Sequence, residues 1–418
     1  MTIATVAGAT LAKRTVDREQ AIIWFVTLQF FVLIYLQRFA LAPNSFPLSI
    51  PMVAMLGGIG WMVFTQQLSF DPKRLATYLL FAGACLLSQS FSGGSFPSLM
   101  QLIVLYAAMT VSIKVSHEAY LKILDRFIKL MIVPCICMII QFTYQKATGE
   151  PTPLSMNRLV PQSMMLQGYF YEAHYPWYSN YSRPNGFFML EPSYASAFSA
   201  TALIMEITYF RRLRMVLFLT VATLMTQGST GISMLLIAGP FLLIREKWAV
   251  IISTVTAIVA ALVIAIAVDA PLPLVSRVGE FKSESSSGSE RLLMPAERFL
   301  ELAFDPAYFI IGDGGGSVIQ KVETQKNGAP KTGTAVMNPW PMVKVLNEYG
   351  LIAMISYLTL YGMGIAGRFN VPLKIALSVV FLFTGGYLVS PPVMTLMVML
   401  FFLVSPQTQP ARAQRGDH

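Results

Sequence analysis

An arginine, a turn and the start of an apolar stretch meet in the segment RPNGFFMLEPSYA, which runs from Arg183 to Ala195. Arg183 stands directly before a Pro-Asn-Gly turn. Its planar guanidinium group suits the oxygens of a diphosphate, and the free N–H groups at the start of a following helix also favour anions. The simpler alternative is that Arg183 extends along apolar surface toward lipid phosphate. We favour anion binding because the residue is tied to a tight turn.

Two residues near this turn are candidates for a general base. Glu191 arrives where a membrane helix should enter lipid, and an ionisable group at that depth usually faces a partner or a wet cavity. The other reading is that it complements the positive end of a helix. His174 is the one histidine expected on the outer side. Histidine suits proton transfer near neutral pH, although a lone loop histidine is often structural. Tyr194, just after Glu191, is a candidate substrate contact.

Aromatic residues are frequent in the segment before Arg183. Flat rings with hydroxyl groups suit sugar binding, but tyrosine and tryptophan also gather at membrane interfaces, so both interpretations stay open. These residues are Tyr169, Phe170, Tyr171, Tyr175, Trp177, Tyr178 and Tyr181.

A second pair of arginines lies in the segment SGSERLLMPAERFLELAF. Arg291 and Arg298 are seven residues apart and would share one face of a continuous helix. Pro295 interrupts that continuity, because proline fits the first turn of a helix and not its interior. The alternative is an amphipathic helix that lies on the membrane surface. We expect Arg291, with Arg298 beside it, to bind the same anion as Arg183.

A glycine-rich segment, IGDGGGS, follows these arginines and contains Gly312 and Gly314. It lacks the Gly-Lys-Ser/Thr ending of a phosphate loop, so we expect a backbone turn that lets the chain approach a substrate closely. Asn338 and Glu348 form a further polar cluster at the outer mouth of the next apolar run.

The sequence predicts no metal or other cofactor. No outer pair of acids has the Asp-X-Asp form that binds a metal diphosphate, and the histidines are too few for a metal site. Arginines would instead stabilise the charge that develops on a diphosphate leaving group. The three cysteines lie in apolar runs and imply no disulfide framework.

The composition excludes an ordinary soluble protein. Hydrophobic residues make up 55% of the 418 residues and charged residues only 12%, whereas a soluble domain carries about 25% charged residues. The mean hydropathy is +0.59. The net charge of +9 is not gathered on one polar face, so no nucleic-acid partner is expected. We predict an all-α polytopic membrane protein, in which residues 1–418 form a single integral membrane domain.

Twelve apolar runs are long enough, or nearly so, to cross about 30 Å of hydrocarbon. They are residues 21–41, 48–65, 75–90, 98–113, 127–145, 187–209, 213–227, 230–245, 248–268, 348–367, 372–389 and 391–405.

The distribution of lysine and arginine between the short loops indicates which side of the membrane each loop faces. With a cytoplasmic N-terminus, most lysines and arginines fall on the cytoplasmic side, and the short outer loops hold only Arg38. Both termini are then cytoplasmic, and two long loops, 146–186 and 269–347, lie outside. The cytoplasmic loops are too short to hold a nucleotide. We therefore expect any reaction to take place on the outer side of the membrane. Its substrate would already be activated when it arrives, most simply through attachment to a lipid carrier.

Together these residues resemble the O-antigen polymerase and ligase superfamily, the Wzy/WaaL type of bacterial surface-polysaccharide enzyme. The family's first-loop arginine before a helix looks like Arg183 in RPNGFFMLEP. Its second-loop arginine after a serine-rich approach looks like Arg291 in SGSERLLMP. Its following Gly-X-Gly looks like Gly312 and Gly314.

The family's Glu-X-Gly at the next helix start matches Glu348 and Gly350. The family often has a His-Asn pair shortly before it, but this chain reads Met337-Asn338 with no histidine. Either Asn338 keeps part of that role, or His174 or Glu191 activates the acceptor.

The resemblance implies a GT-C-like glycosyltransferase architecture of about a dozen helices in the bacterial inner membrane, with the active site facing the periplasm. It implies a polymerase of O-antigen or exopolysaccharide. Such an enzyme moves a glycan from polyprenyl (undecaprenyl) diphosphate onto a lipid-linked repeat unit. Expected partners are that substrate, membrane lipid and a chain-length regulator or export complex. The alternatives are a ligase that joins glycan to lipid A core or protein, and a transporter or flippase of lipid-linked sugars.

Overall fold

The computed structural model describes residues 3–41, 48–166, 169, 182–245, 306–317, 340–366, 370–384, 386 and 388–407. The described chain is mostly helical, as the sequence predicts. Several predicted features lie outside the described residues. They are His174, Arg291, Arg298, Asn338, the expected span at 248–268 and most of the expected loop at 269–347.

The amino-terminal elements alternate long helices with very short strands. In chain order they are α1 (Ile3–Tyr35), β1 (Ala40–Leu41), β2 (Leu48–Ser49), α2 (Ile50–Phe64), β3 (Ser69–Phe70), α3 (Pro72–Ser92), α4 (Phe96–Ala107), β4 (Val111–Val115) and α5 (His117–Thr148). Four of the helices begin at a polar residue whose side chain accepts a backbone N–H of the first turn, which satisfies donors that the helix itself leaves open. These N-cap residues are Ser49, Asp71, Ser95 and Ser116.

The remaining described elements follow α5 in the chain. They are α6 (Pro192–Met205), α7 (Leu213–Met225), α8 (Ser229–Arg245), α12 (Pro306–Ile311), α14 (Pro341–Ile365), α15 (Val371–Phe383), α16 (Pro391–Met397) and β5 (Val404–Pro406). Two helices change to π-helical geometry at their ends, α6 over Glu206–Phe210 and α16 over Val398–Leu403.

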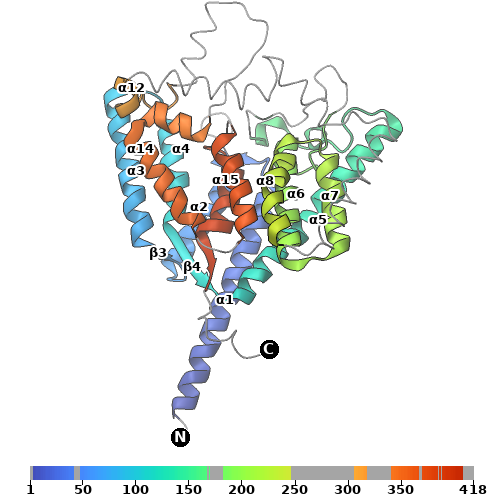
Figure 1. The fold of residues 1–418 in the computed structure, drawn as a ribbon, viewed down its shortest axis with the longest axis horizontal. Coiled ribbons are helices and arrows are strands. Elements are labelled where there is room, and N and C mark those ends of the chain that lie inside the picture. Colours follow the sequence, from blue (N-terminus) through green and yellow to red (C-terminus); the bar gives the residue numbers. More distant parts are fainter. Residues whose placement is uncertain are drawn as a thin grey trace, which may run out of the picture.

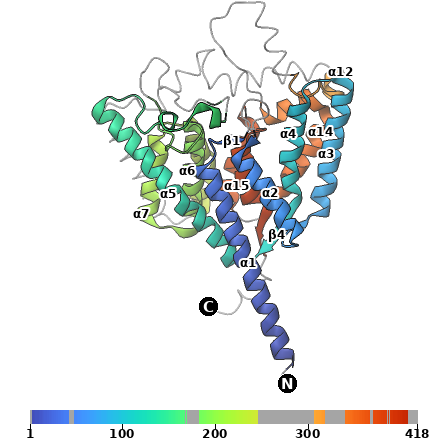
Figure 2. The same cartoon turned by 180° about the vertical axis from the view of Figure 1, so that it is seen from behind.

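The helices form two lateral groups joined by a central one (Figure 1, Figure 2). One group contains α3, α4, α12 and α14, and α3 packs along α14. The other contains α5, α6 and α7. Between them α8 packs against both α6 and α15, while α15 also contacts α14. The buried apolar side chains form one continuous core through all three groups.

The two ends of the bundle differ. At the end where α1 enters, β3, β4 and β5 form a small sheet in that order, with β3 antiparallel and β5 parallel to β4. At the opposite end lie the β1–β2 pair, the segment after α5, and α12. The described parts of both expected long loops therefore share one end of the molecule, and α1 and β5 meet at the other.

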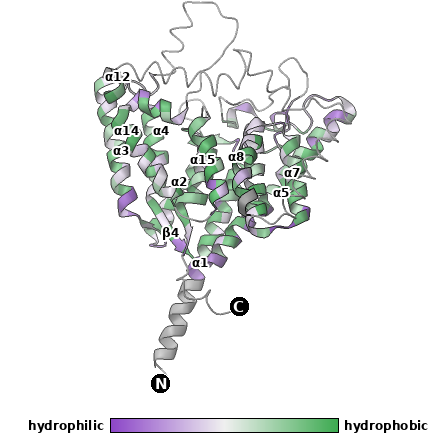
Figure 3. Ribbon diagram, viewed as in Figure 1, coloured by the Kyte–Doolittle hydropathy of each residue, from purple (hydrophilic) through white to green (hydrophobic). Residues whose placement is uncertain are grey.

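The described helices consist largely of hydrophobic residues (Figure 3), and many large apolar side chains among them are exposed. Trp61, Phe64 and Phe91 are 65%, 81% and 77% exposed. Among the described helices, Asp17–Tyr35 and Pro72–Ser92 are long and apolar enough to cross a membrane. Shorter apolar helices are Ile50–Phe64, Phe96–Thr110, Leu213–Met225, Ser229–Leu242, Val371–Phe383 and Pro391–Leu403.

The structure corrects the expected elements at several boundaries. The all-α prediction missed five short strands. The expected span at 98–113 ends as a helix at Ala107, and 111–115 is a strand because Val111, Ile113 and Val115 alternate toward the core. The expected span at 187–209 becomes helical only at Pro192, because the chain before it forms turns.

Candidate functional site

Gln141 of α5 holds the Pro-Asn-Gly turn that follows Arg183. Its side-chain oxygen accepts hydrogen bonds from the backbone N–H groups of Asn185 at 3.1 Å and Gly186 at 2.9 Å. Its side-chain nitrogen donates to the Asn185 side-chain oxygen at 3.2 Å. That same oxygen accepts the backbone N–H of Phe187 at 3.2 Å, which closes the turn. One helical side chain therefore accepts the backbone N–H groups of two consecutive residues of the turn.

Gln145, one helical turn further along α5, holds the chain just before Arg183. Its side-chain nitrogen donates to the backbone oxygens of Pro151 at 2.6 Å and Ser182 at 2.9 Å. The backbone N–H of Ser182 also donates to Pro151 at 3.0 Å. Arg183 therefore projects from backbone that α5 fixes on both sides.

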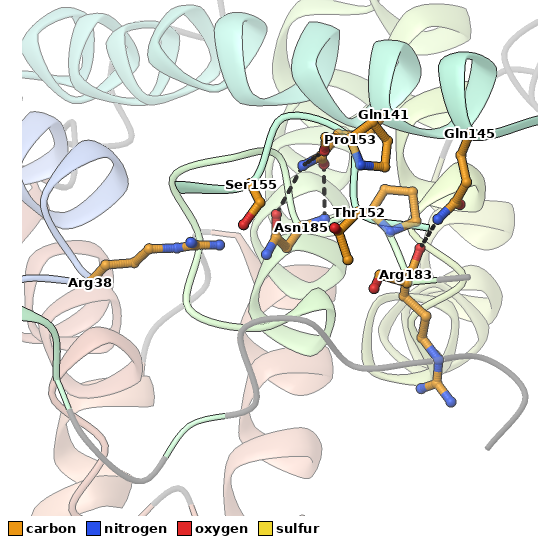
Figure 4. A pocket seen from close by; sticks show the side chains of 10 residues that line it. Arg38, Gln141, Gln145, Thr152, Pro153, Ser155, Arg183 and Asn185 are labelled. Carbon is orange, nitrogen blue, oxygen red and sulfur yellow. Dashed lines mark hydrogen bonds between the residues drawn. The ribbon is translucent and has the colours of Figure 1, made fainter. Parts of the chain in front are cut away.

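A hollow of about 310 Å³, a volume that includes open solvent, lies beside this turn (Figure 4). Its lining residues come from the turn after α1, from α5 and from the segment between α5 and α6. They are Arg38, Gln141, Gln145, Thr152, Pro153, Ser155, Ser182, Arg183, Pro184 and Asn185. The Arg183 side chain points away from Gln141, while the Arg38 side chain reaches in from the other end toward Asn185.

The turn after α1 holds the two residues that precede Glu191. Arg38 is only 1% exposed, and its Nε donates to the backbone oxygen of Met189 at 2.7 Å. The side-chain oxygen of Gln37 accepts the backbone N–H of Leu190 at 3.2 Å. Two consecutive residues of the turn after α1 therefore fix the approach to α6.

Glu191 occupies the N-cap position of α6 and is 9% exposed. Its carboxylate caps no backbone N–H of the helix; instead it accepts a hydrogen bond from the Ser193 hydroxyl at 3.1 Å. The Tyr194 hydroxyl is 2.8 Å from the Ser390 hydroxyl, directly before α16. Tyr194 also meets the ring of Tyr169 edge-on, with centroids 6.0 Å apart. The carboxylate thus sits close to the turn in sequence, at the start of a buried helix.

The glycine-rich segment packs backbone against backbone. Gly312 and Gly314 have φ angles of 81° and 83°, which other residues rarely adopt. A Cβ on Gly312 would lie 2.7 Å from the backbone oxygen of Glu348, and one on Gly314 would strike the backbone of Gly93. Because protein backbone occupies this space, close packing accounts for both glycines without a ligand.

Glu348 lies under this segment and is 1% exposed. Its carboxylate receives a hydrogen bond from the backbone N–H of Gly316, and its Oε1 lies 3.8 Å from Lys344 Nζ. Among the described residues, Oε1 makes no hydrogen bond. The backbone oxygen of Glu348 accepts hydrogen bonds from the Ser88 hydroxyl at 2.9 Å and the Gly314 N–H at 2.8 Å. Glu348 thus joins α3, α14 and the glycine segment.

The predicted site residues fall into two clusters. Arg183, Glu191 and Tyr194 lie with α5 and α6, whereas Gly312, Gly314 and Glu348 lie with α3 and α14, in the other lateral group. Both clusters are at the loop end of the bundle. The sequence predicted one joint site around Arg183 and Arg291; Arg291 lies outside the described residues, so that joint site stays a prediction.

The sequence interpretation missed the residues that hold the first cluster in place. Gln141 and Gln145 are four apart on one helix face, which is a recognisable signal of a shared contact. Arg38 was noted only as a charge in an outer loop, and its burial depends on a contact across 151 residues of chain.

Comparisons with known proteins do not place the chain in a family. No model of a known protein family matches it, and no curated protein matches it in sequence. Within the part of the chain that the structure describes, no group of three or more His, Cys, Asp or Glu residues could hold a metal ion.

Proposed function

We propose that this protein is a polysaccharide polymerase of the bacterial inner membrane that uses a polyprenyl diphosphate-linked donor at the periplasmic face. The observation that carries the proposal is the turn after Arg183. It is fixed to α5 by Gln141 and Gln145 and leads directly into the buried carboxylate of Glu191. A cation on fixed backbone, followed eight residues later by a buried carboxylate, supplies the two groups that transfer from a diphosphate leaving group needs.

The proposed reaction exchanges one bond for another at the anomeric carbon of the growing glycan. A hydroxyl oxygen at the non-reducing end of the next lipid-linked repeat unit forms the new glycosidic bond. The bond from the anomeric carbon to the diphosphate oxygen breaks, and polyprenyl diphosphate leaves with that electron pair. Arg183 holds the diphosphate, assisted by Arg291 and Arg298 of the second loop.

Glu191 accepts the proton that the acceptor hydroxyl loses. Its carboxylate is almost fully buried and receives the Ser193 hydroxyl, so it is held in one orientation. This is a general-base role, and it needs the base within hydrogen-bond reach of the acceptor. His174 is the other candidate for the same role. The diphosphate leaving group needs little general-acid catalysis once the arginines neutralise its negative charge.

The proposed membrane arrangement has about twelve spans in a GT-C-like architecture. Exposed apolar side chains such as Trp61, Leu87 and Phe91 support a lipid environment, because soluble proteins rarely expose so many. The described parts of both long loops lie at one end, and α1 with β5 at the other, which supports two cytoplasmic termini. A chain-length regulator or export complex is the expected protein partner.

Purified protein and a polyprenyl diphosphate-linked repeat unit test the proposal. The assay, run in EDTA, compares the wild type with Arg183→Ala and with Arg158→Ala. Arg158 is the matched control because it lies on the same loop, is 60% exposed and pairs with Glu150. We expect long glycan and free polyprenyl diphosphate from the wild type and the control. Arg183→Ala should lose about 100-fold in rate, as removal of one group that stabilises transition-state charge does. Folded wild-type protein that makes no polymer from its cognate donor, even with divalent metal, would contradict the proposal.

A further inference from the structure

The glycine segment, residues 312–317, is docked at the loop end of the bundle through its backbone. It directly follows α12, which packs on α14 and lies near the end of α3 in both views (Figure 1, Figure 2). The segment reads Gly-Asp-Gly-Gly-Gly-Ser and has no apolar side chain. Because it has so little apolar surface to bury, hydrogen bonds to its backbone set its position.

The end of α3 and the turn after it hold one side of the glycine segment. The side-chain oxygen of Gln89 accepts the backbone N–H of Gly315 at 2.8 Å. The Ser92 hydroxyl donates to the backbone oxygen of Gly312 at 2.7 Å. The backbone N–H of Ser95 donates to the backbone oxygen of Gly315 at 2.6 Å. Both backbone polar groups of Gly315 are therefore bonded to this side.

A break in α14 holds the other side. Gly350 has a φ of 79° and a ψ of −178°, which are not helical values. The last carbonyl groups before such a break lack donors from their own helix. The carbonyl oxygens of Asn347 and Glu348 accept the backbone N–H groups of Asp313 and Gly314, each at 2.8 Å. The glycine segment thus supplies donors to the broken helix.

The glycine segment is a described part of the long loop that carries Arg291 and Arg298. The proposed reaction assigns both arginines to the donor diphosphate, and both lie outside the described residues. In the sequence, Arg298 stands eight residues before Pro306, where α12 begins. A group that takes part in the transition state has to be held accurately, because a displacement of about 1 Å costs about 100-fold in rate. The contacts that fix this loop to α3 therefore bear on the reaction.

We propose that Gln89 and Ser92 of α3 are positioning residues for the transfer reaction. They hold the glycine segment and, through it, the loop arginines that bind the donor diphosphate. This inference rests on the proposed function and deepens it, because it adds α3 to the elements that arrange the reaction. Neither side chain needs to touch the substrate. Gln89 is the sharper test, since its side-chain oxygen is the acceptor of the Gly315 N–H.

Hydrogen exchange of the purified full chain in detergent tests the structural half of the proposal. Gln89→Leu removes the acceptor oxygen, whereas Gln89→Glu keeps one. Ser90→Ala is the matched control, because Ser90 is the next residue of α3 and its hydroxyl donates to the backbone oxygen of Leu86 in its own helix at 2.9 Å. Backbone amides of residues 312–317 should exchange about tenfold faster in Gln89→Leu, because the local opening needs less free energy. Gln89→Glu and Ser90→Ala should exchange as the wild type does.

Polymerisation of a polyprenyl diphosphate-linked repeat unit tests the functional half. Gln89→Leu should lower kcat by about tenfold, and Gln89→Glu should keep most of the rate. When Arg291→Gln is already present, Gln89→Leu should cost less than about twofold, because the arginine that it positions is gone. When Arg183→Gln is present, the tenfold cost should remain, since Arg183 is held by α5. A role in stability alone would give the same cost in both backgrounds.

Three results would overturn the inference and leave the polymerase in place. They are unchanged hydrogen exchange in Gln89→Leu, faster exchange with a full polymerisation rate, and an equal cost in the two arginine backgrounds. Where Gln89→Leu fails to fold, Ser92→Ala carries the same measurements, because Ser92 is an exposed residue at the end of α3. Folded wild-type protein that makes no polymer from its cognate donor contradicts the proposed function, and this inference with it.

Discussion

Arg38 Nε and the backbone oxygen of Met189 are joined by a 2.7 Å hydrogen bond across 151 residues of chain. The neighbouring Gln37 accepts the N–H of Leu190 at 3.2 Å. The turn that follows α1 is thereby fastened to the segment that leads into Glu191. A residue near the N-terminus thus helps set the position of a candidate catalytic carboxylate.

Replacing Gln141 by leucine should disturb the Arg183 turn from a distance. The N–H groups of Asn185 and Gly186 would lose their acceptor inside the protein, which costs about 2 kcal/mol or more. We expect a lower unfolding temperature in detergent and a clear loss of polymerase rate. Thr143→Val is the control, because Thr143 lies on the same helix and, among the described residues, its hydroxyl donates to the backbone oxygen of Ile139 in its own helix. Equal stability and activity of Gln141→Leu would show that the turn holds without this side chain.

Glu191→Gln tests the base without changing the volume of the side chain. If Glu191 accepts the acceptor proton, kcat should fall by about 100-fold or more while KM changes little. Glu150→Gln serves as the control, because Glu150 lies on the same loop and pairs with Arg158 at 2.6 Å. If His174→Ala abolishes turnover and Glu191→Gln does not, the histidine is the base.

Gly314→Ala should destabilise the fold through backbone geometry alone. A φ of 83° costs a non-glycine residue about 1 kcal/mol or more. The new Cβ would also strike the backbone of Gly93, which cannot swing aside as a flexible side chain can. Gly57→Ala is the matched control, because nothing lies within 4 Å of its Cβ position in α2. The control should be neutral or more stable by up to about 1 kcal/mol. Thermal unfolding of both variants in detergent measures this difference. Equal unfolding temperatures would contradict the packing described for this segment.

Asp125, at the end of the bundle near the start of α5, should make stability depend on acid pH. Burial raises its pKa, but hydrogen bonds from Lys129 at 2.6 Å and Arg212 at 2.8 Å outweigh burial, so the pKa lies below its ordinary value. A lowered pKa contributes stability above the unfolded value of about 3.9, and that stability is lost as pH falls through the folded value.

Asp125→Asn should therefore lower the free energy of unfolding at pH 7 by about 0.5 to 1 kcal/mol, a small amount because both cations are partly exposed to solvent. The difference from the wild type should shrink as the pH drops below about 4. Chemical unfolding across this pH range measures it. Glu118→Gln is the control, since Glu118 is 79% exposed and pairs only with exposed Lys122 among the described residues. A wild-type advantage that grows in acid would refute the assignment.

The sequence determined the helical character, most of the apolar segments and the turn at Pro184-Asn185-Gly186. These features depend on composition, on periodicity and on residues close together in the chain, and all three are present in the sequence itself. It also marked Gly312 and Gly314 as positions of a backbone turn, and both have positive φ angles.

Only the tertiary structure decided what surrounds these features. Arg38, Gln141 and Gln145 gained their roles through contacts with backbone atoms, and backbone donors and acceptors look alike at every position in a sequence. The same reason hid the packing of Gly314 against Gly93. It also hid the division of the predicted site between two helix groups, because the neighbours of a helix are chosen by side-chain fit between distant segments and not by its own pattern.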